Sequence, residues 1–387
     1  MREEYELHKR IKKLAGKDVE IWAAQSIAQA FDKLSIPYPK TEKGTPSFTK
    51  TFLSEHPSEI ANLIVQCRNV NKTHGSFIDG VMKYVHKGRV HSHVNQLRSD
   101  DGGTVSGRMS YNSPNLQQIP ARDPQLGPLI RSLFIPEEGT QWAAIDFSQQ
   151  EPRILVHYAK AFGDSRNAPL AGVEEIVDAY CTKMDTDFHT MVAEMAKIPR
   201  KQAKTINLGM MYGMGVNKLS EKLGIEVEEA KSIISQYHER VPFVKGLMNG
   251  VMNHLNERDS SGSVRSLLGR KCRFDLWEPD RFEMNKAMPF EQAVQEYGKT
   301  TKLKRAYTYK ALNRLIQASA ADMTKKAMVD IYQSGRVPLI QIHDEVAISV
   351  QDKSDAENIS RIMENAVPLE VPNKCDVEVG RSWGTAQ

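Results

Sequence analysis

The stretch QIHDEVAISV, residues 341–350, places three ionisable side chains between two apolar runs. The pattern predicts a tight β-hairpin whose crest carries His343, Asp344 and Glu345. Three such side chains at the crest of an apolar hairpin are costly unless something occupies them. The hairpin is therefore the first candidate for a functional site.

The composition is that of an ordinary globular protein. The 387 residues are 40% hydrophobic and 26% charged, with a formal net charge of +4. This length allows more than one subdomain, and the mildly basic charge permits a nucleic-acid partner without requiring one.

Cysteine spacing and the absence of targeting signals indicate the cellular compartment. The four cysteines lie far apart with no C-x-x-C pair, which argues against a zinc ribbon or a disulfide framework. The charged N-terminus lacks the apolar core of a signal peptide, and no apolar run reaches membrane-spanning length. We expect a soluble intracellular protein with no membrane partner.

Hydrophobic periodicity outlines the elements around the hairpin. Residues 19–85 are predicted to be mainly helical, and residues 89–96 to form a short strand before a polar, basic loop. TQWAAIDFS (140–148) has the nearly continuous apolar run of a buried strand. The chain between residue 172 and Met288 is predicted to be mostly helical, and one long helix is predicted over residues 302–334.

Two acids stand at predicted strand ends. Asp146 closes the strand in TQWAAIDFS and Asp344 lies on the hairpin crest, so the two could meet on one sheet. Paired carboxylates on a rigid sheet suit Mg²⁺, and two such ions about 3.5–4 Å apart support phosphoryl transfer. The alternative for either acid alone is a turn cap or an ion pair with a neighbouring arginine.

The segment PRKQAKTINLGMMYGMG predicts a helix from Pro199 to Gly213. Arg200, Lys204, Leu208 and Tyr212 recur every four residues and share one stripe. The cations lie in the N-terminal half, where the helix dipole is also positive. Such a stripe could hold a nucleoside triphosphate lengthwise, with its phosphates on the cations. A basic amphipathic helix without a ligand is the alternative.

Glu151 admits a structural and a functional interpretation. Ser148 and Glu151 match a capping box, but Pro152 would then lie inside the helix, where its missing N–H deletes a hydrogen bond. Because proline prefers the first helical position, the helix is predicted to begin at Pro152. The Glu151 side chain would then point at the site beside Asp146.

Several motifs, in order, resemble those of the family A DNA polymerases, the group of bacterial DNA polymerase I and related phage enzymes. The matching segments are TVSGRMSYNSPNLQQIP (104–120), DFSQQEPR (146–153, motif A), RKQAKTINLGMMYG (200–213, motif B), LNRLIQASAADMTKKAM (312–328), QIHDEV (341–346, motif C) and VEVGRSWG (377–384). Several motifs in the correct order are far more specific than any one of them.

The resemblance implies an α+β right-hand fold, with an antiparallel-sheet palm, helical fingers and a helical thumb. The implied parts are the thumb with its lead-in (1–86), the first part of the palm (87–165), the fingers (166–297) and the second part of the palm (298–387).

The resemblance also implies residue roles. Asp146, Asp344 and the backbone carbonyl of Phe147 would bind two Mg²⁺ ions, with Mn²⁺ able to substitute. The nucleotide-binding residues would be Arg200, Lys204, Leu208, Tyr212, Glu151 and His189. Lys204 would also protonate the pyrophosphate, and Glu151 would be the steric gate that crowds a ribose 2′-hydroxyl.

A third set would contact the primer–template: Arg108, Asn115, Gln117, Asn313, Gln317 and His343. Purine N3 and pyrimidine O2 are minor-groove acceptors on every correct base pair, so donors there can test pair geometry without reading sequence. Glu345 is expected to be structural rather than catalytic.

The implied function is template-directed synthesis of DNA from dNTPs on a primer–template. The implied protein is a monomer in the cytoplasm of a bacterium or phage-infected host, with accessory proteins unspecified and no proofreading exonuclease in this chain. A single-subunit RNA polymerase shares the palm, but Glu151 argues against it. A two-metal nuclease is a second alternative, but it would not need the stripe that runs from Arg200 to Tyr212. A non-catalytic DNA-binding accessory protein is a third, but it would not need to keep both predicted metal-binding acids and both predicted phosphate-binding cations.

Three residues depart from the family pattern. Leu208 stands where the family usually has Phe or Tyr, the residue associated with tolerance of 3′-deoxy sugars. Pro152 replaces an aliphatic residue after the gate, and Tyr309 replaces an arginine that contacts DNA in many bacterial members.

Overall fold

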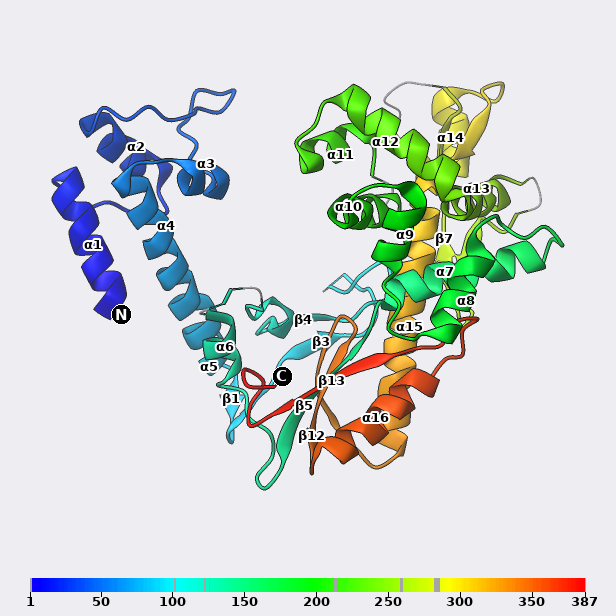
Figure 1. The fold of residues 1–387 in the computed structure, drawn as a ribbon. Coiled ribbons are helices and arrows are strands. Elements are labelled where there is room, and N and C mark those ends of the chain that lie inside the picture. The colour runs from blue at the N-terminus through cyan, green and yellow to red at the C-terminus, as the bar shows by residue number, and fades with distance from the viewer. Residues whose placement is uncertain are drawn as a thin grey trace. The chain divides into compact units, whose positions relative to one another are not determined.

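The chain folds into two compact units (Figure 1). A computed structural model describes residues 2–100, 102–121, 123–124, 126–211, 214–257, 260–281 and 286–386. Unit 1 comprises Met1–His93 and Tyr111–Arg131, and unit 2 comprises Val94–Ser110 and Ser132–Gln387.

Unit 1 is mainly helical, which confirms the prediction for residues 19–85. Its elements are α1 (Arg2–Ala15), α2 (Ala24–Lys33), α3 (Lys50–Glu55), α4 (Glu59–Lys72), a π-helical turn (Thr73–Asp79), α5 (Gly80–Met82), the hairpin β1 (Val85–His86) and β2 (Arg89–Val90), a 3₁₀ turn (Leu116–Gln118) and α6 (Leu126–Arg131). Thr49 and Ser58 cap α3 and α4 by accepting bonds from backbone N–H groups three residues on. Ile11, Phe31 and Ile64 lie in its buried core.

Unit 2 is built on a four-stranded antiparallel sheet in the order β11-β12-β5-β13. The strands are β11 (Pro338–Ile342), β12 (Glu345–Val350), β5 (Gln141–Phe147) and β13 (Cys375–Gly380). This sheet and the helices beside it confirm the predicted α+β class, and the sheet contains both the strand predicted in TQWAAIDFS and the predicted hairpin.

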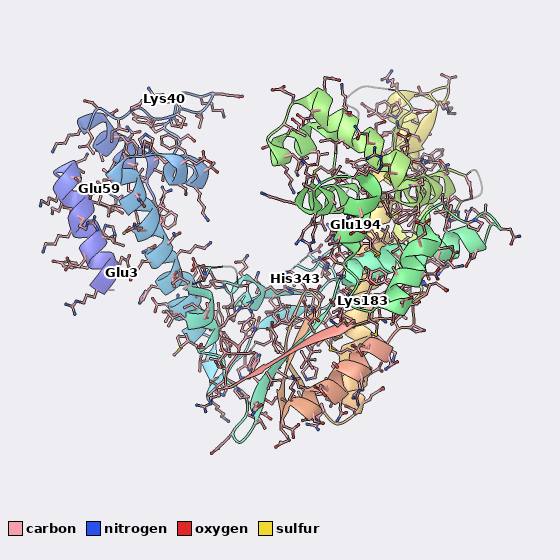
Figure 2. The ribbon with its side chains drawn as sticks, viewed as in Figure 1. Glu3, Lys40, Glu59, Lys183, Glu194 and His343 are labelled. Carbon is pink, nitrogen blue, oxygen red and sulfur yellow. The ribbon has the colours of Figure 1, made fainter. Side chains whose placement is uncertain are left out.

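The predicted hairpin has a two-residue turn made of His343 and Asp344. His343 lies at this turn (Figure 2) and adopts the left-handed region with φ 59°. The Asp344 carbonyl accepts a hydrogen bond from the Phe147 N–H at 3.3 Å. The turn is therefore attached to the end of β5 by the main chain.

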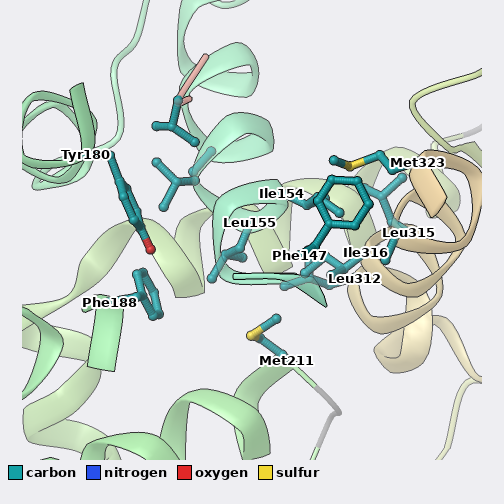
Figure 3. Packing of buried hydrophobic residues seen from close by; sticks show 14 of the residues in the cluster. Phe147, Ile154, Leu155, Tyr180, Phe188, Met211, Leu312, Leu315, Ile316 and Met323 are labelled. Carbon is teal, nitrogen blue, oxygen red and sulfur yellow. The ribbon is translucent and has the colours of Figure 1, made fainter. Parts of the chain in front are cut away.

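Helices pack on one face of this sheet and on one another. They are α7 (Gln150–Asp164), α8 (Val173–Thr182), α9 (Phe188–Ala196), α10 (Arg200–Met211), α11 (Val216–Leu223), α12 (Val227–Arg240), α13 (Pro242–Asn256), α15 (Ala311–Gln333) and α16 (Lys353–Asn365), whereas α14 (Phe290–Tyr297) packs on a smaller sheet. Because side chains alternate along a strand, Ile145 and Phe147 enter the core while Asp146 faces the other way. Phe147 belongs to the same buried cluster as Leu312 and Ile316 of α15 (Figure 3).

The predicted start of the long helix was wrong. The long helix begins at Ala311 rather than Lys302, because β10 (Leu303–Arg305) pairs with β8 (Leu276–Pro279) in a small sheet that also contains β9 (Met288–Pro289). The segment predicted to be mostly helical as far as Met288 is helical over most of its length, from α8 to the end of α13 at Asn256, before β8 and β9. Long-range pairing of this kind leaves little periodic signal in so short a strand.

Other short strands complete the fold. The strand predicted over residues 89–96 is two strands, β2 and β3 (His93–Asn95), and β4 is Ser110–Asn112. β6 (Ser263–Arg265) and β7 (Lys271–Arg273) form a hairpin. Among the helices the structure describes, none has the length and apolarity needed to cross a membrane.

Candidate active site

Strand register brings the predicted acids together on the face of the sheet opposite the core. Asp146 pairs with Glu345 of β12 on one side and with Asp376 of β13 on the other. Asp344 precedes Glu345, and its carboxyl lies within hydrogen-bonding reach of Asp146. The sheet therefore gathers carboxylates that are about 200 residues apart in sequence.

Ionisation of these acids is unfavourable in the absence of a cation. Burial raises the pKa of Asp146, and the negative charges of Asp344 and Glu345 raise it further. Burial also raises the pKa of Asp344, although its backbone hydrogen bond and Arg108 oppose that shift. Two adjacent carboxylates that resist ionisation favour a bound cation or proton.

The donor atoms at this point fit a hard divalent cation. Asp146 Oδ1 is buried and makes no hydrogen bond, so it has a lone pair to offer. The Phe147 carbonyl follows directly at the last residue of β5. Within the described residues, no group of three or more His, Cys, Asp or Glu side chains is arranged to hold a metal ion. Backbone, water or substrate oxygens would therefore complete a Mg²⁺ shell here.

Glu345 has a different environment from Asp146. Its carboxylate accepts a hydrogen bond from Trp383 Nε1 at 3.1 Å. Trp383 stacks on Trp142 of β5, with ring centroids 6.0 Å apart. These contacts fit the structural role expected for Glu345.

A pocket of about 320 Å³ lies beside the acids. Six of the predicted site residues line it: Arg108, Glu151, His189, Leu208, His343 and Asp344. They come from the loop before β4, from α7, α9 and α10, and from the hairpin turn, so the fold of unit 2 alone assembles this set. Gln149, Gln150 and Pro152 complete the lining.

Glu151 points into this pocket, but the predicted start of its helix was wrong. α7 begins at Gln150, with Gln149 as N-cap in the left-handed region. Pro152 is the third helical residue, and its missing N–H costs nothing because the N–H groups of the first turn have no partner within a helix. Glu151 forms an ion pair of 2.5 Å with Arg108 and is largely buried, with 12% of its side chain exposed.

The predicted cations lie on the exposed face of α10. α10 begins at Arg200, and the Pro199 carbonyl accepts the first helical hydrogen bond, from the Ala203 N–H. Pro199 is therefore the residue before the helix and not its first residue, as was predicted. Arg200 pairs with Asp187 and donates to Thr190 Oγ1 at 3.2 Å. Lys204 is exposed one turn later, and Tyr212 and Gly213 lie outside the described residues.

His189 is buried and its protonation is set by its neighbours. Burial lowers the pKa of His189, as do the charges of Lys204 and Arg200, whereas Asp187 opposes them. Asn207 accepts a bond from Tyr237 Oη at 2.6 Å through its carbonyl oxygen, so its amide nitrogen faces His189 Nδ1 at 3.0 Å. Nδ1 therefore accepts, and the neutral imidazole carries its proton on Nε2.

The remaining predicted DNA contacts occupy two places. Asn313 and Gln317 lie one turn apart on α15 and are half-buried. Asn115 and Gln117 belong to unit 1, where the Asn115 side chain accepts a bond from Gln117 N–H at 3.1 Å.

Some site residues were missed in the sequence. Gln149 accepts from Phe188 N–H at 2.8 Å and donates to Thr186 O at 3.0 Å, which joins the start of α7 to α9. Asn207 could have been found as a polar residue on the apolar side of an amphipathic helix. Asp376 gave no signal, because only strand pairing places it beside Asp146.

Comparison with known proteins identifies the family. A family model described as DNA polymerase family A matches residues 1–385. The chain therefore belongs to DNA polymerase family A, which confirms the resemblance found in its motifs.

Individual relatives agree with this assignment. A DNA-directed DNA polymerase of Pseudomonas phage M6 is 35% identical over 94% of this chain and 57% of the phage protein. A thermostable DNA polymerase I of Thermus aquaticus is 32% identical over 98% of this chain and 44% of that protein. The chain spans about half the length of the curated relatives it matches.

A solved structure is similar over nearly the whole chain. It is the POL domain of Pol1 from M. smegmatis in complex with DNA primer-template and dNTP, with a TM-score of 0.74 and 28% sequence identity. The match covers 99% of this chain and 64% of that one.

Proposed function

We propose that this chain extends a DNA primer along a template, using dNTPs. The observation that carries the proposal is the convergence of Asp146 and Asp344 beside a pocket that contains Glu151 and His189. Family membership supports it, as does the likeness to a polymerase domain in complex with DNA primer-template and dNTP.

In the proposed reaction the primer 3′-oxygen attacks the α-phosphorus of the dNTP. A new P–O bond forms, the bond to the β-phosphate oxygen breaks, and the hydroxyl proton is released while Lys204 protonates the departing pyrophosphate. Two Mg²⁺ ions held by Asp146, Asp344 and the Phe147 carbonyl, or Mn²⁺ in their place, would activate the hydroxyl and stabilise the leaving oxygen.

The phosphates are proposed to lie on Arg200, Lys204 and His189. Arg200 already pairs with Asp187, so a triphosphate would exchange one anionic partner for another rather than neutralise a lone cation. The neutral His189 would donate a hydrogen bond from its Nε2–H group to a phosphate oxygen. Closure of α10 over the nucleotide would exclude water.

Sugar and base are proposed to contact Leu208 and Tyr212, with Glu151 crowding a 2′-hydroxyl. Arg108, Asn115, Gln117, Asn313, Gln317 and His343 would follow the primer–template. The thumb (1–86), palm (87–165 and 298–387) and fingers (166–297) are proposed on the same basis. Two further properties of this chain stay predictions: the lack of proofreading activity and the monomeric state.

Primer extension tests the proposal. With a labelled DNA primer–template, Mg²⁺ and dNTPs, we expect the parent protein to extend the primer and Asp344→Asn to lose at least about 100-fold in rate, because a charge at the reacting centre is removed. Asp355→Asn is a matched control, because Asp355 pairs with Arg336 and does not line the pocket.

Either of two results would contradict the proposal. Extension that survives Asp344→Asn would remove Asp344 from the metal site. Degradation of the primer in the absence of nucleotides would indicate a nuclease instead.

A further inference from the structure

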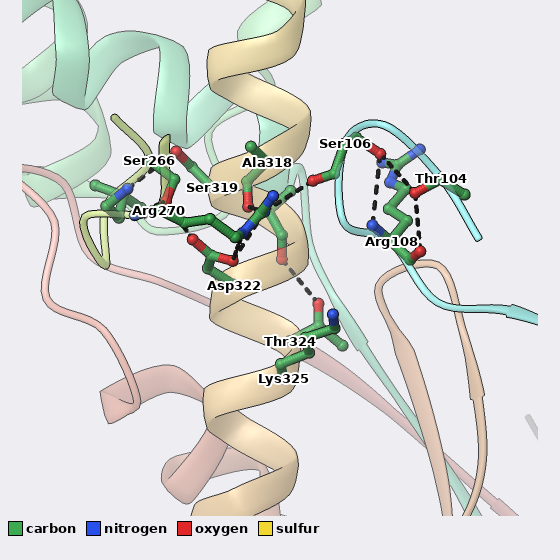
Figure 4. A network of polar contacts seen from close by, with 12 residues as sticks. Thr104, Ser106, Arg108, Ser266, Arg270, Ala318, Ser319, Asp322, Thr324 and Lys325 are labelled. Carbon is green, nitrogen blue, oxygen red and sulfur yellow. Dashed lines mark hydrogen bonds and ion pairs between the residues drawn. The ribbon is translucent and has the colours of Figure 1, made fainter. Parts of the chain in front are cut away.

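The loop that carries Arg108 is a closed turn held against α15. Within residues 104–108, the Thr104 hydroxyl donates to the Arg108 carbonyl at 2.9 Å and Gly107 N–H donates to Thr104 O at 3.3 Å. From outside, the Arg270 guanidinium donates to Ser106 O at 2.8 Å (Figure 4). We call residues 104–108 the Arg108 loop.

Arg270 is itself fixed by a buried carboxylate. Its Nε donates to Asp322 Oδ1 at 2.9 Å, and its Nη2 donates to Ala318 O at 2.9 Å, both on α15 (Figure 4). Asp322 is 7% exposed and also accepts from the Ser266 hydroxyl. The guanidinium therefore has one orientation, and it presents a fixed surface to the Arg108 loop.

Gly107 lets the loop backbone reach that surface. It is buried, with φ +81°, and a Cβ built there would lie 2.5 Å from Arg270 Nη1. Any side chain would strain the backbone and push the loop away from the guanidinium. The close contact between Gly107 and Arg270 thus depends on two features: the fixed orientation of the guanidinium and the missing side chain of the glycine.

The helix that carries Glu151 is attached to the same part of α15. Gln150 Nε2 donates to Ala320 O at 3.3 Å and to Thr324 Oγ1 at 3.2 Å. Two turns of α15 therefore fix both partners of the 2.5 Å pair between Arg108 and Glu151, one through Arg270 and the other through Gln150.

We propose that Arg270 and Asp322 are positioning residues for sugar selection: they hold the Arg108 loop so that Arg108 fixes the Glu151 carboxylate. Neither residue lines the pocket, so they would act only through Arg108. This inference rests on the proposed role of Glu151 as steric gate. Without the contact to Arg270, the Arg108 loop would move and Arg108 would no longer hold the Glu151 carboxylate in one position. The carboxylate could then adopt other rotamers, and a ribose 2′-hydroxyl would fit beside it.

The experiment compares kcat/KM for dATP and ATP in single-nucleotide primer extension. We expect Arg270→Lys and Gly107→Ala, which disturb one contact from opposite sides, each to lower the preference for dATP by about 3- to 30-fold, the range for residues that act through others. The change should appear mainly as a lower KM for ATP. Arg336→Lys is the matched control, since Arg336 forms a bidentate pair with Asp355 elsewhere in unit 2, and it should leave the preference unchanged.

A double variant and a stability check complete the test. Glu151→Ala should lower the preference on its own, and adding Gly107→Ala should lower it no further, because both act on one group. Thermal unfolding of each variant shows whether it is folded, and Gly107→Ala tests the idea even if Arg270→Lys does not fold.

The outcomes separate this inference from the proposed function. If Glu151→Ala relaxes selection while folded Arg270→Lys and Gly107→Ala keep it, the positioning role is wrong and the gate stands. If Glu151→Ala changes nothing, the gate itself is wrong and the inference falls with it.

Discussion

Asp146 shows most clearly how function and stability compete in this chain. It occupies a buried strand end, has an oxygen with no hydrogen bond, and lies beside Asp344. A sequence selected only for stability would place a neutral or apolar residue there. We propose that the cost is retained because the pair forms the proposed cation site.

We predict that Asp146→Asn stabilises the metal-free protein while abolishing extension. Because the folded protein raises the pKa of Asp146, its carboxyl favours folding while protonated, and that contribution is lost as pH rises through the raised value. The variant should therefore gain little at about pH 4, where the carboxyl is substantially protonated in the folded and unfolded protein alike, and about 1 kcal/mol or more at about pH 9. Urea unfolding with a chelator present measures this.

Glu378→Gln is the control for that prediction. Glu378 lies on the same face of the sheet but is exposed, so its neutralisation should change stability little. An Asp146→Asn protein that is less stable than its parent at both pH values would show that no repulsion is present.

At the scale of elements, the start of α7 depends on one buried arginine. Arg153 is 1% exposed and donates to three carbonyls, Ser148 O at 2.9 Å, Met184 O at 2.7 Å and Pro372 O at 2.5 Å. Its guanidinium also lies 4.5 Å from the centroid of the Tyr180 ring. One side chain thus joins the β5–α7 turn to the chain before α9 and the chain before β13.

Arg153→Met should destabilise the protein by about 3 kcal/mol or more, because three buried carbonyls lose their donor. Arg153→Lys keeps the charge but not the planar fork, so it should be intermediate. Urea unfolding of the three proteins tests this order. A Met variant within about 1 kcal/mol of its parent would mean that water replaces the guanidinium.

Comparison of sequence and structure shows which signals are local. β5 and the hairpin followed from apolar runs, and the meeting of Asp146 with Asp344 followed from both lying at strand ends. The start of α7 was misplaced because a proline early in a helix costs nothing there. The pair between Arg108 and Glu151 and the contact of Gln149 with Phe188 join segments far apart, which no local pattern encodes.

At the scale of the whole molecule, a net charge of +4 is too small to account for the proposed binding to DNA, so local cations would have to contribute. We predict that affinity for a primer–template falls by at least about 100-fold between about 50 and about 200 mM salt. Lys204→Ala should leave the slope of log K against log salt unchanged, because Lys204 is proposed to contact the dNTP and not the primer–template. Fluorescence anisotropy measures both, and a flat salt response would rule out an electrostatic surface.

The order of strands in the sheet also has a consequence in time. β5 lies in the interior of the sheet, yet its partner β12 is made about 200 residues later and β13 later still. At about 5–20 residues per second, a ribosome needs about 10–40 s to supply the first partner. During that interval β5 has two unpaired edges and an apolar run, which is the kind of segment that aggregates. Slowing translation between residues 148 and 344 should therefore lower the yield of soluble protein more than slowing it after residue 380.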